Sequence, residues 1–292
     1  MVTTLLEDTR ELTNFIAGHP KLIVLTGAGV SCDSGIPTYR DQRGDWRHQT
    51  PIQEKAFLED QNMQRRYWAR SRYGWPVIRD ALPNPAHVAL AELEARGHIE
   101  LLITQNVDGL HQKAGSKNVI DLHGRVDRVS CLSCGTLYGR EDVQSLLDST
   151  NAWPVEIPQT PRPDGDMDVP DDFLTELELP ECPDCFGQMK PDVVFFGGSV
   201  AKAKVQTCLD ALEQADALLV VGSSLMVYSG YRFCRHSSKL EKPIAIINPG
   251  VTRADELAHL KLVSLASPLL TQVTEQLSRF SGPDSSGHDN PS

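Results

Sequence analysis

The sequence predicts an α/β fold: a parallel sheet with helices on both faces, joined to a small module that carries four cysteines. Short apolar runs alternate along the chain with amphipathic stretches of helical length, as expected for successive βαβ units. A glycine-rich turn follows the first apolar run, and two Cys-x-x-Cys pairs interrupt the alternation in the middle of the chain. These features indicate a ligand site at the edge of a sheet and a separate metal-binding insert.

The first elements are predicted by their apolar spacing and their end signals. Residues 7–17 form a helix with one apolar side, and the run Leu22–Leu25 is typical of a strand buried on both faces. A second helix begins after Asn84, which can cap it, has Pro85 in its first turn and ends at Gly97. Strands are expected to follow at 99–104 and 119–122.

The alternation resumes in the C-terminal part of the chain. Helices are predicted at 202–214, 228–239 and 269–280, and strands at 217–222 and 243–248. Residues 31–80 and 126–186 break the pattern. Because a packed domain rarely carries such long insertions without a function, both are expected near a site.

Composition is that of an ordinary globular protein and disfavours some functions. The 292 residues are 40% hydrophobic and 23% charged, and no apolar run reaches the roughly 20 residues that span a bilayer. The net charge of −11 argues against a nucleic-acid partner, since phosphate binding depends on clustered Lys and Arg. That charge suits either simple solubility or the binding of lysine-rich segments. Because the acidic stretch 1–18 lacks the features of a secretory or transit signal, we expect a cytoplasmic protein without membrane attachment.

Four of the seven cysteines form the two pairs, which are Cys131, Cys134, Cys182 and Cys185. Each pair places two sulfur atoms on one turn, and four thiolates provide the closed tetrahedral ligand set of a structural Zn²⁺ ion. Gly135 and Gly187 follow the pairs and favour tight turns. A redox role is the alternative, but two pairs without thioredoxin-like surroundings argue against it. We therefore expect one structural zinc ion that stabilises the insert.

Three predicted strand ends carry small or polar residues. The stretch Gly27–Ser31 follows the first strand, and its backbone amides can approach a pyrophosphate closely. It lacks the complete G-x-G-x-x-G pattern, so a plain tight turn is the alternative. Gly222–Ser224 and Asn248–Gly250 follow two later strands. Because ligands of open α/β sheets bind beyond the carboxyl ends of the strands, the three ends together favour a dinucleotide and a Rossmann-like domain.

Longer motifs surround these turns, and they resemble those of one protein family. Residues 27–41 read GAGVSCDSGIPTYRD and residues 104–115 read TQNVDGLHQKAG. The stretches LHG at 122–124, PDVVFFG at 191–197 and GSS at 222–224 follow in the family's order. Over about residues 10–280 the chain resembles the sirtuin family of NAD⁺-dependent protein-lysine deacylases.

Finer motifs resemble the class II branch of that family, which includes the mitochondrial sirtuin 4. They are RYWAR at 66–70 with GWP at 74–76, NPAH at 84–87, PDGD at 163–166 and YSGYR at 228–232. The acidic N-terminal stretch differs from a mitochondrial precursor, so we expect a bacterial, cytoplasmic member.

The resemblance implies the chemistry of the family. The acyl oxygen of a modified lysine attacks C1′ of the nicotinamide ribose through an oxocarbenium-like state, expels nicotinamide and leaves an alkylimidate. A base must then activate a ribose hydroxyl, which takes over the acyl group. His123 of the LHG motif is the implied base, and an unperturbed pKa of about 6.5 suits proton abstraction close to neutral pH. A turn residue at a strand end is the alternative reading of His123.

The same resemblance implies the contacts with NAD⁺. Asn106 and Asp108 are implied to fix the ribose and nicotinamide ends together with Gln105, and they are counted with His123 as catalytic. Arg40 is implied to meet the phosphates, where a planar, permanently charged group is suitable, or else to form a surface ion pair with Asp41. The implied cofactor set is Gly27, Ala28, Ser31, Ile36, Tyr39, Arg40, Gln105, Asn106, Asp108, Gly222, Ser223, Ser224, Asn248 and Ala266.

Proteins or peptides that contain acyl-lysine are the implied partners. The segment Val193–Gly197 is expected to pair with an extended peptide through its backbone. At least one of Phe195 and Phe196 is expected to wall the acyl-lysine tunnel, although both also suit an ordinary core.

The acyl group that is removed stays open between two readings. Tyr67 and Arg70 lie three residues apart on a predicted helix and resemble the Tyr-x-x-Arg pair with which some sirtuins bind acidic acyl groups. Other arginines lie close to this pair, so the alternative is that Arg70 belongs to a solvated helix face. The enzyme would then be a plain deacetylase.

Two other functions stay open beside deacylation. A mono-ADP-ribosyltransferase would use the same pocket and NAD⁺ but pass ADP-ribose to a protein nucleophile. A non-catalytic NAD-sensing zinc scaffold would bind without reaction, and His123 argues against it because a binding module needs no base. A hydride-transferring dehydrogenase is disfavoured by the incomplete dinucleotide pattern.

The sequence predicts two structural parts, a Rossmann-like domain and a zinc-binding module inserted into it. Residues 1–125 are predicted to form the first part of the Rossmann-like NAD-binding domain, with a helical insertion at about 42–80. Residues 126–186 form the zinc-binding module, 187–280 the second part of the Rossmann-like domain, and 281–292 a disordered tail.

Overall fold

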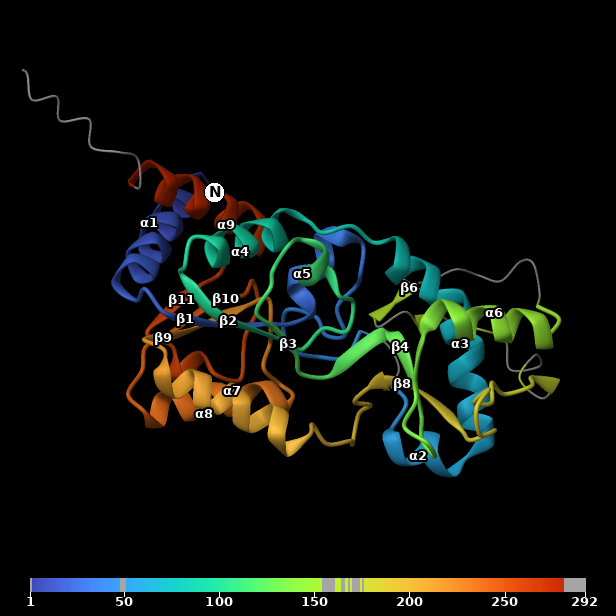
Figure 1. Cartoon of the computed structure of the whole chain (residues 1–292). Coiled ribbons are helices and arrows are strands. Elements are labelled where there is room, and N and C mark those ends of the chain that lie inside the picture. The colour runs from blue at the N-terminus through green and yellow to red at the C-terminus, as the bar shows by residue number, and fades with distance from the viewer. Residues whose placement is uncertain are drawn as a thin grey trace, which may run out of the picture.

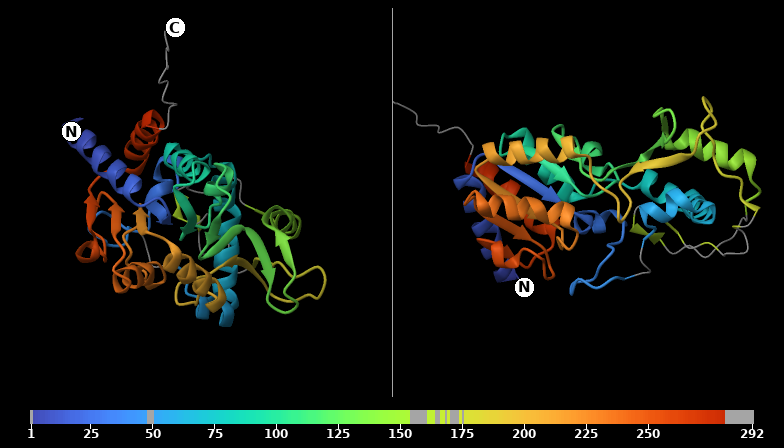
Figure 2. Two further views of the ribbon diagram at one scale, coloured as in Figure 1. Left: turned by 60° about the vertical axis from the view of Figure 1, so that its left-hand side comes forward. Right: turned by 90° about the horizontal axis from the view of Figure 1, so that it is seen from below.

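The computed structural model describes residues 2–47, 51–153, 161–163, 166–167, 169, 174 and 176–280. They form a large α/β lobe and a smaller lobe beside it, which are seen from three directions in Figures 1 and 2. The disordered tail predicted at 281–292 and most of residues 154–175, within the predicted zinc module, lie outside the described residues. Within the described ranges no helix is both long enough and apolar enough to cross a membrane.

A parallel sheet of six strands, in the order β11-β10-β9-β1-β2-β3, forms the centre of the large lobe. The strands are β1 Leu22–Thr26, β2 Ile99–Thr104, β3 Val119–Asp121, β9 Ala217–Val221, β10 Ile244–Ile247 and β11 Leu260–Leu262. All five residues of β1 are buried, because helices cover both faces of the sheet. Thr26 pairs with Thr104 and Val221, so β1, β2 and β9 end at one level.

Helices cover the two faces of this sheet in separate groups (Figure 1). The helices α1 Val2–Gly18, α4 Pro85–Ala95 and α9 Ala266–Phe280 lie on one face, and α7 Lys202–Gln214 and α8 Tyr228–Lys239 on the other. The short α5 Leu110–Lys113 and the 3₁₀ segments η1 Ala28–Ser34 and η4 Asp255–Leu257 complete the lobe. One apolar core lies under each group, and alternate β1 residues such as Ile23 and Val24 belong to opposite cores.

The sequence-based prediction of the fold class is confirmed. Strand 99–104 and helices 202–214 and 228–239 have the predicted bounds. The Asn84 side chain accepts from the N–H groups of Ala86 and His87, while His87 Nδ1 accepts from the Asn84 N–H, which forms a full capping box. Two helices begin earlier than predicted, at Val2 and Ala266, and β11 was not predicted at all.

The smaller lobe contains an antiparallel sheet in the order β5-β4-β8. Its strands are β4 Gly124–Cys131, β5 Leu137–Gly139 and β8 Met189–Val193. The lobe also contains the helices α2 Glu54–Glu59, α3 Gln61–Asp80 and α6 Arg140–Thr150 and the antiparallel pair β6 Pro161–Arg162 and β7 Asp166–Met167. Trp68 of α3 packs in one core with Val129, Leu147 and Met189. The helical insertion and β8 therefore join the cysteine module in space, and the division of the chain into domains stays a prediction.

Candidate functional site

A cleft of about 1050 Å³ opens at the level where β1, β2, β9 and β10 end, and both lobes line it. The predicted site residues that line it are Gly27, Ala28, Tyr39, Arg40, Tyr67, Arg70, Gln105, Asn106, His123, Val193, Phe195, Phe196, Gly197, Gly222, Ser223, Ser224, Asn248 and Ala266. Ser31, Ile36 and Asp108 lie behind this surface, around a small hollow that they share with Ala28 and Asn106.

Two glycine turns interlock at the base of the cleft. The N–H of Gly29 donates to Gly222 O at 2.8 Å, and the N–H of Gly27 donates to Val221 O at 3.1 Å. A Cβ on Gly29 would lie 2.7 Å from Gly222 O, and a Cβ on Gly222, where φ is +61°, would lie 2.5 Å from Val30 N. Only glycine fits at both positions, so the two turns present bare backbone to the cleft.

A buried polar network supports the next turn, after β2. Asn106 Nδ2 donates to Gly27 O at 3.2 Å and to Ser31 Oγ at 3.0 Å, and the Ser31 hydroxyl donates to Asp108 Oδ2 at 2.8 Å. Burial raises the pKa of Asp108, and the bonds that its carboxylate accepts from the Leu110 N–H and Ser31 oppose the rise. The network fixes the Asn106 amide at the cleft wall.

His123, in the turn between β3 and β4, is held through both ring nitrogens. Nδ1 lies 2.8 Å from Gln105 O, and Nε2 lies 2.7 Å from Ser229 Oγ. Burial lowers the pKa of His123, the Gln105 bond opposes this, and the charges of Lys204 and Arg232 lower the pKa further. The ring is therefore neutral at neutral pH, as a general base must be.

Aromatic rings form two walls of the cleft. Phe195 contacts Phe57 and Tyr67, with ring centroids 5.1 and 5.2 Å apart, whereas Phe196 contacts Tyr39 and Trp46 at 5.5 and 5.6 Å. Both phenylalanines line the cleft, and neither is buried in the core. An acyl chain that entered between these walls would meet apolar surface.

Arg40 also belongs to the Phe196 wall. Its guanidinium lies 3.8 Å from the centroid of the Trp46 ring, and Nη1 donates to Gly44 O at 2.7 Å. Asp41 accepts instead from the N–H groups of Arg43 and Asp45, so the alternative ion pair between Arg40 and Asp41 is not formed. The loop thereby holds Arg40 at the cleft.

Tyr67 and Arg70 lie on α3 and both line the cleft. Only 6% of the Arg70 surface is exposed, which argues against a solvated face for this arginine. Arg72, by contrast, is outside the cleft lining and pairs with Asp148 at 2.8 Å.

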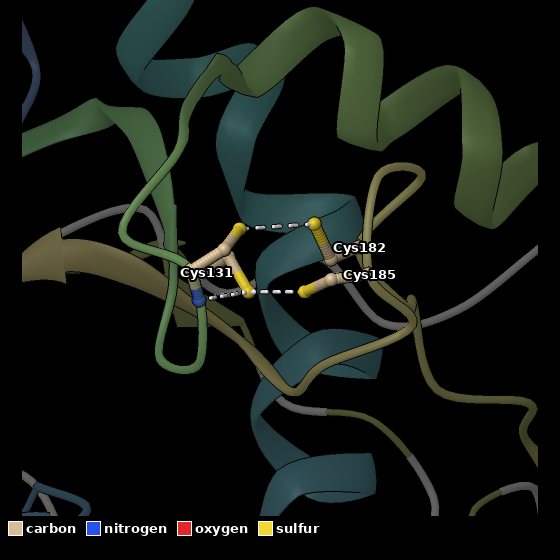
Figure 3. A group of neighbouring side chains, drawn as sticks. Cys131, Cys182 and Cys185 are labelled. Carbon is tan, nitrogen blue, oxygen red and sulfur yellow. Dashed lines mark hydrogen bonds between the residues drawn. The ribbon is translucent and has the colours of Figure 1, made fainter.

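The four cysteines converge in the smaller lobe, as Figure 3 shows for three of them. Their sulfur atoms all lie within 4.8 Å of one another, with 3.5 Å between Cys131 and Cys185 and 3.7 Å between Cys134 and Cys182. Zn–S bonds of about 2.3 Å in a tetrahedron place sulfur atoms about 3.8 Å apart, so the cluster fits one structural Zn²⁺ ion. A Cβ on Gly187 would lie 2.4 Å from Ser133 Oγ, 2.7 Å from Ser133 Cβ and 3.0 Å from Cys131 Sγ, which explains the glycine there.

Several cleft residues had no predicted role. Trp46, Ser229 and Arg232 line the cleft, and Ser229 contacts His123 directly. In the sequence, the motif at 228–232 indicates only the class II branch. Its position just after a strand end that carries Gly222–Ser224 was the available signal.

Fold and site together define an α/β protein of the NAD-binding kind, with a separate four-sulfur site for zinc. More particularly, the chain belongs to the Sir2 family, whose profile matches residues 27–229. This confirms the resemblance to sirtuins that the motifs indicated.

Individual relatives agree with this assignment, and most of the similar proteins are bacterial. NAD-dependent protein deacetylase 2 of Bradyrhizobium diazoefficiens is 49% identical over 253 residues, which are 87% of this chain and 93% of that protein. NAD-dependent protein deacylase Sirt4 of Drosophila melanogaster is 41% identical and covers 91% of this chain and 86% of its own length.

Solved structures of the family share the fold. A complex of Sir2 with a p53 peptide and NAD⁺ has a TM-score of 0.72 and 29% identity, and it covers 92% of this chain and 98% of its own. A Sir2 complex with a deacetylated p53 peptide and 3′-O-acetyl-ADP-ribose has a TM-score of 0.74 and 30% identity, over 91% of this chain and 97% of its own.

Proposed function

We propose that this chain is an NAD⁺-dependent protein-lysine deacylase, which transfers the acyl group from lysine to ADP-ribose and releases nicotinamide. One observation carries the proposal: a neutral, partly buried His123 lies in a cleft that glycine turns line on one side and the segment after β8 on the other. The names of the Bradyrhizobium and Drosophila relatives, and the ligands in the two Sir2 complexes, support the same reaction.

NAD⁺ is the proposed co-substrate of this cleft. The bare backbone of the Gly27–Gly29 and Gly222–Ser224 turns suits the phosphates, with Arg40 as their charged partner. Asn248, whose amide is oriented by a 2.9 Å bond to Gly250 O, suits the adenosine hydroxyls or base. The fixed Asn106 amide, backed by Ser31 and Asp108, suits the nicotinamide and ribose end.

His123 is the proposed base that activates the ribose. Its Nε2 takes the proton of a ribose hydroxyl: the O–H bond breaks, the N–H bond forms, and the freed oxygen takes over the acyl group. The low pKa of His123 keeps the ring ready to accept at neutral pH. Proton transfer of this kind contributes roughly 10²- to 10⁴-fold to a rate.

An extended acyl-lysine peptide is the proposed second substrate, bound along Val193–Gly197. Within this segment the Val194 N–H already donates to His123 O, and the Phe196 carbonyl accepts from the Glu54 N–H. The carbonyls of Phe195 and Val193 are also occupied, by the Gly198 N–H and by Lys190 Nζ. A peptide would therefore pair with the other backbone groups, and its acyl-lysine would pass between the Phe195 and Phe196 walls.

Tyr67 and Arg70 are proposed to select an acyl chain that ends in a carboxylate. The buried position of Arg70 in the cleft supports this, since a buried guanidinium pairs strongly with a carboxylate. Replacing Arg70 with Ala should lower turnover of a succinyl- or glutaryl-lysine peptide by roughly 10-fold or more relative to an acetyl-lysine peptide. Arg72→Ala, on the same helix but outside the cleft, is the matched control. Equal losses on all peptides would contradict the selection role.

The cytoplasm is the proposed location, and neither nucleic acid nor membrane is a proposed partner. All seven cysteines are free thiols, as a reducing compartment maintains and as thiolate ligands of zinc require. The net charge of −11 disfavours binding to phosphate backbones and anionic lipid.

Incubation of the zinc-loaded protein with NAD⁺ and an acetyl-lysine peptide tests the proposed function. Mass spectrometry should find deacylated peptide, nicotinamide and acyl-ADP-ribose in equal amounts, and none of them without NAD⁺. ADP-ribose retained on protein, with the peptide still acylated, would establish the transferase alternative instead. Binding of NAD⁺ without any product would point to the sensing scaffold.

A further inference from the structure

The N-terminal turn of α8 reaches the ring of His123. Ser229 Oγ lies 2.7 Å from His123 Nε2, and Gln105 O lies 2.8 Å from Nδ1. A carbonyl oxygen can only accept, so Nδ1 carries the ring proton and donates to Gln105. Nε2 is then the only acceptor on the neutral ring, and the Ser229 hydroxyl donates to it.

The close approach of α8 depends on the residue after Ser229. A Cβ on Gly230 would lie 2.4 Å from Gln105 Oε1 and 2.7 Å from Gln105 Cδ. Gln105 cannot move away easily, because its Nε2 donates to Thr26 O at 3.1 Å and to Ser223 Oγ at 2.8 Å. Gly230 therefore lets α8 contact the turn after β2, and this contact sets Ser229 against His123.

We propose that Ser229 is a positioning residue for the base of the deacylation reaction. In the free enzyme its hydroxyl holds the ring with Nδ1 protonated and Nε2 directed into the cleft. As a ribose hydroxyl approaches, the Ser229 O–H turns away and frees the one lone pair of Nε2, which then takes the ribose proton. The Ser229 oxygen, still beside the ring, accepts a share of the new N–H. Ser229 neither gains nor loses a proton, so the transfer itself involves only the ribose oxygen and Nε2. This inference rests on the proposed function.

The charged groups around His123 cannot accept a hydrogen bond from the protonated ring, whereas Ser229 can. Lys204 of α7 donates to Asp121 O, and Arg232 of α8 lies over the Tyr228 ring. Both are cations, so neither can accept an N–H from the protonated ring. The chain oxygens that bond the ring in the described structure are Gln105 O and Ser229 Oγ, and only the second can change from donor to acceptor.

Comparing the rates of nicotinamide exchange and of acyl transfer distinguishes positioning of the base from a merely structural effect. In the proposed reaction nicotinamide leaves before the base is needed, so exchange of labelled nicotinamide into NAD⁺ reports the steps that precede His123. Ser229→Ala should lower acyl transfer by roughly 3- to 10-fold, the worth of one neutral hydrogen bond, while exchange stays within about twofold of the wild type. Ser229→Thr, which keeps the hydroxyl, should restore acyl transfer.

Controls keep the outcomes distinct. Ser238→Ala, at the exposed far end of α8, should match the wild type in both assays. Nitrogen-15 spectra of the wild type should show a proton on Nδ1 of His123. If Ser229→Ala matches the wild type in acyl transfer, or loses exchange and transfer equally, Ser229 has no positioning role. A wild type that deacylates no peptide would instead contradict the proposed function itself.

Discussion

A buried histidine behind the cleft should make the protein sensitive to acid. His87 of α4 has no exposed surface, and burial lowers its pKa from 6.5 to about 4. Its Nδ1 accepts from the Asn84 N–H at 3.3 Å, while Nε2 donates toward Ser31 Oγ at 3.4 Å. Protonation would place a second N–H against the Asn84 donor, so the folded state resists it.

The size of the effect follows from the two pKa values. Because the folded pKa is the lower one, the unfolded chain binds more protons below pH 6.5, and stability is lost as the pH falls from 6.5 toward 4. Across the whole interval between the two pKa values, the loss of unfolding free energy from His87 is about 3 kcal/mol. At about pH 5 this loss is about 2 kcal/mol.

Urea unfolding at about pH 8 and about pH 5 measures this loss. Other groups also titrate in this range. The change in unfolding free energy between the two pH values is therefore compared for the wild type and for His87→Gln. The variant should be less stable at both pH values, but its pH-dependent loss should be smaller by about 2 kcal/mol. An unchanged pH dependence in His87→Gln would refute the reasoning.

Three further predictions concern the zinc cluster, a glycine turn and a buried arginine. Chelation of zinc, or Cys182→Ser, should remove hydrogen-exchange protection from β4 and β8 but leave it in β1 and β9, because Cys182 belongs to the core of the smaller lobe. Gly222→Ala should cost about 2 kcal/mol or more in unfolding free energy and weaken NAD⁺ binding, whereas Gly18→Ala, with nothing within 4 Å, should be tolerated. Arg140→Met should leave unfolding free energy unchanged or raise it, since among the described residues Arg140 Nε and Nη1 find no partner and burial lowers its pKa to about 10. A loss of about 2 kcal/mol in Arg140→Met, measured by urea unfolding, would contradict this last expectation.

Elements with a local signal could be predicted from the sequence. The helix at Pro85–Ala95 has its cap, its proline and its apolar spacing within about a dozen residues, and β2 contains the apolar run Leu101–Ile103. The strand β8, with the sequence MKPDV, has neither alternation nor a continuous apolar run. It forms because it pairs with β4, a partner distant in the sequence, and such pairing leaves no local pattern.

In the candidate site, too, some features could be predicted from the sequence and others depend on tertiary contacts. The motif residues around Gly27, Gln105 and His123 converge on the cleft because the strands that carry them end at one level, which the βαβ pattern predicts. The contact between Ser229 and His123 could not be predicted, since it depends on how closely the first turn of α8 approaches the turn after β2. The packing of α3 against the cysteine module is likewise a tertiary contact without a local signal.

The most direct test of the central claim is the reaction of His123→Ala with NAD⁺ and an acetyl-lysine peptide. If His123 is the base, formation of acyl-ADP-ribose should fall by roughly 10²- to 10⁴-fold, while the variant still binds NAD⁺ and keeps its zinc. Acyl-ADP-ribose formed by the variant at the wild-type rate would contradict the account, because another group would then have to take the ribose proton.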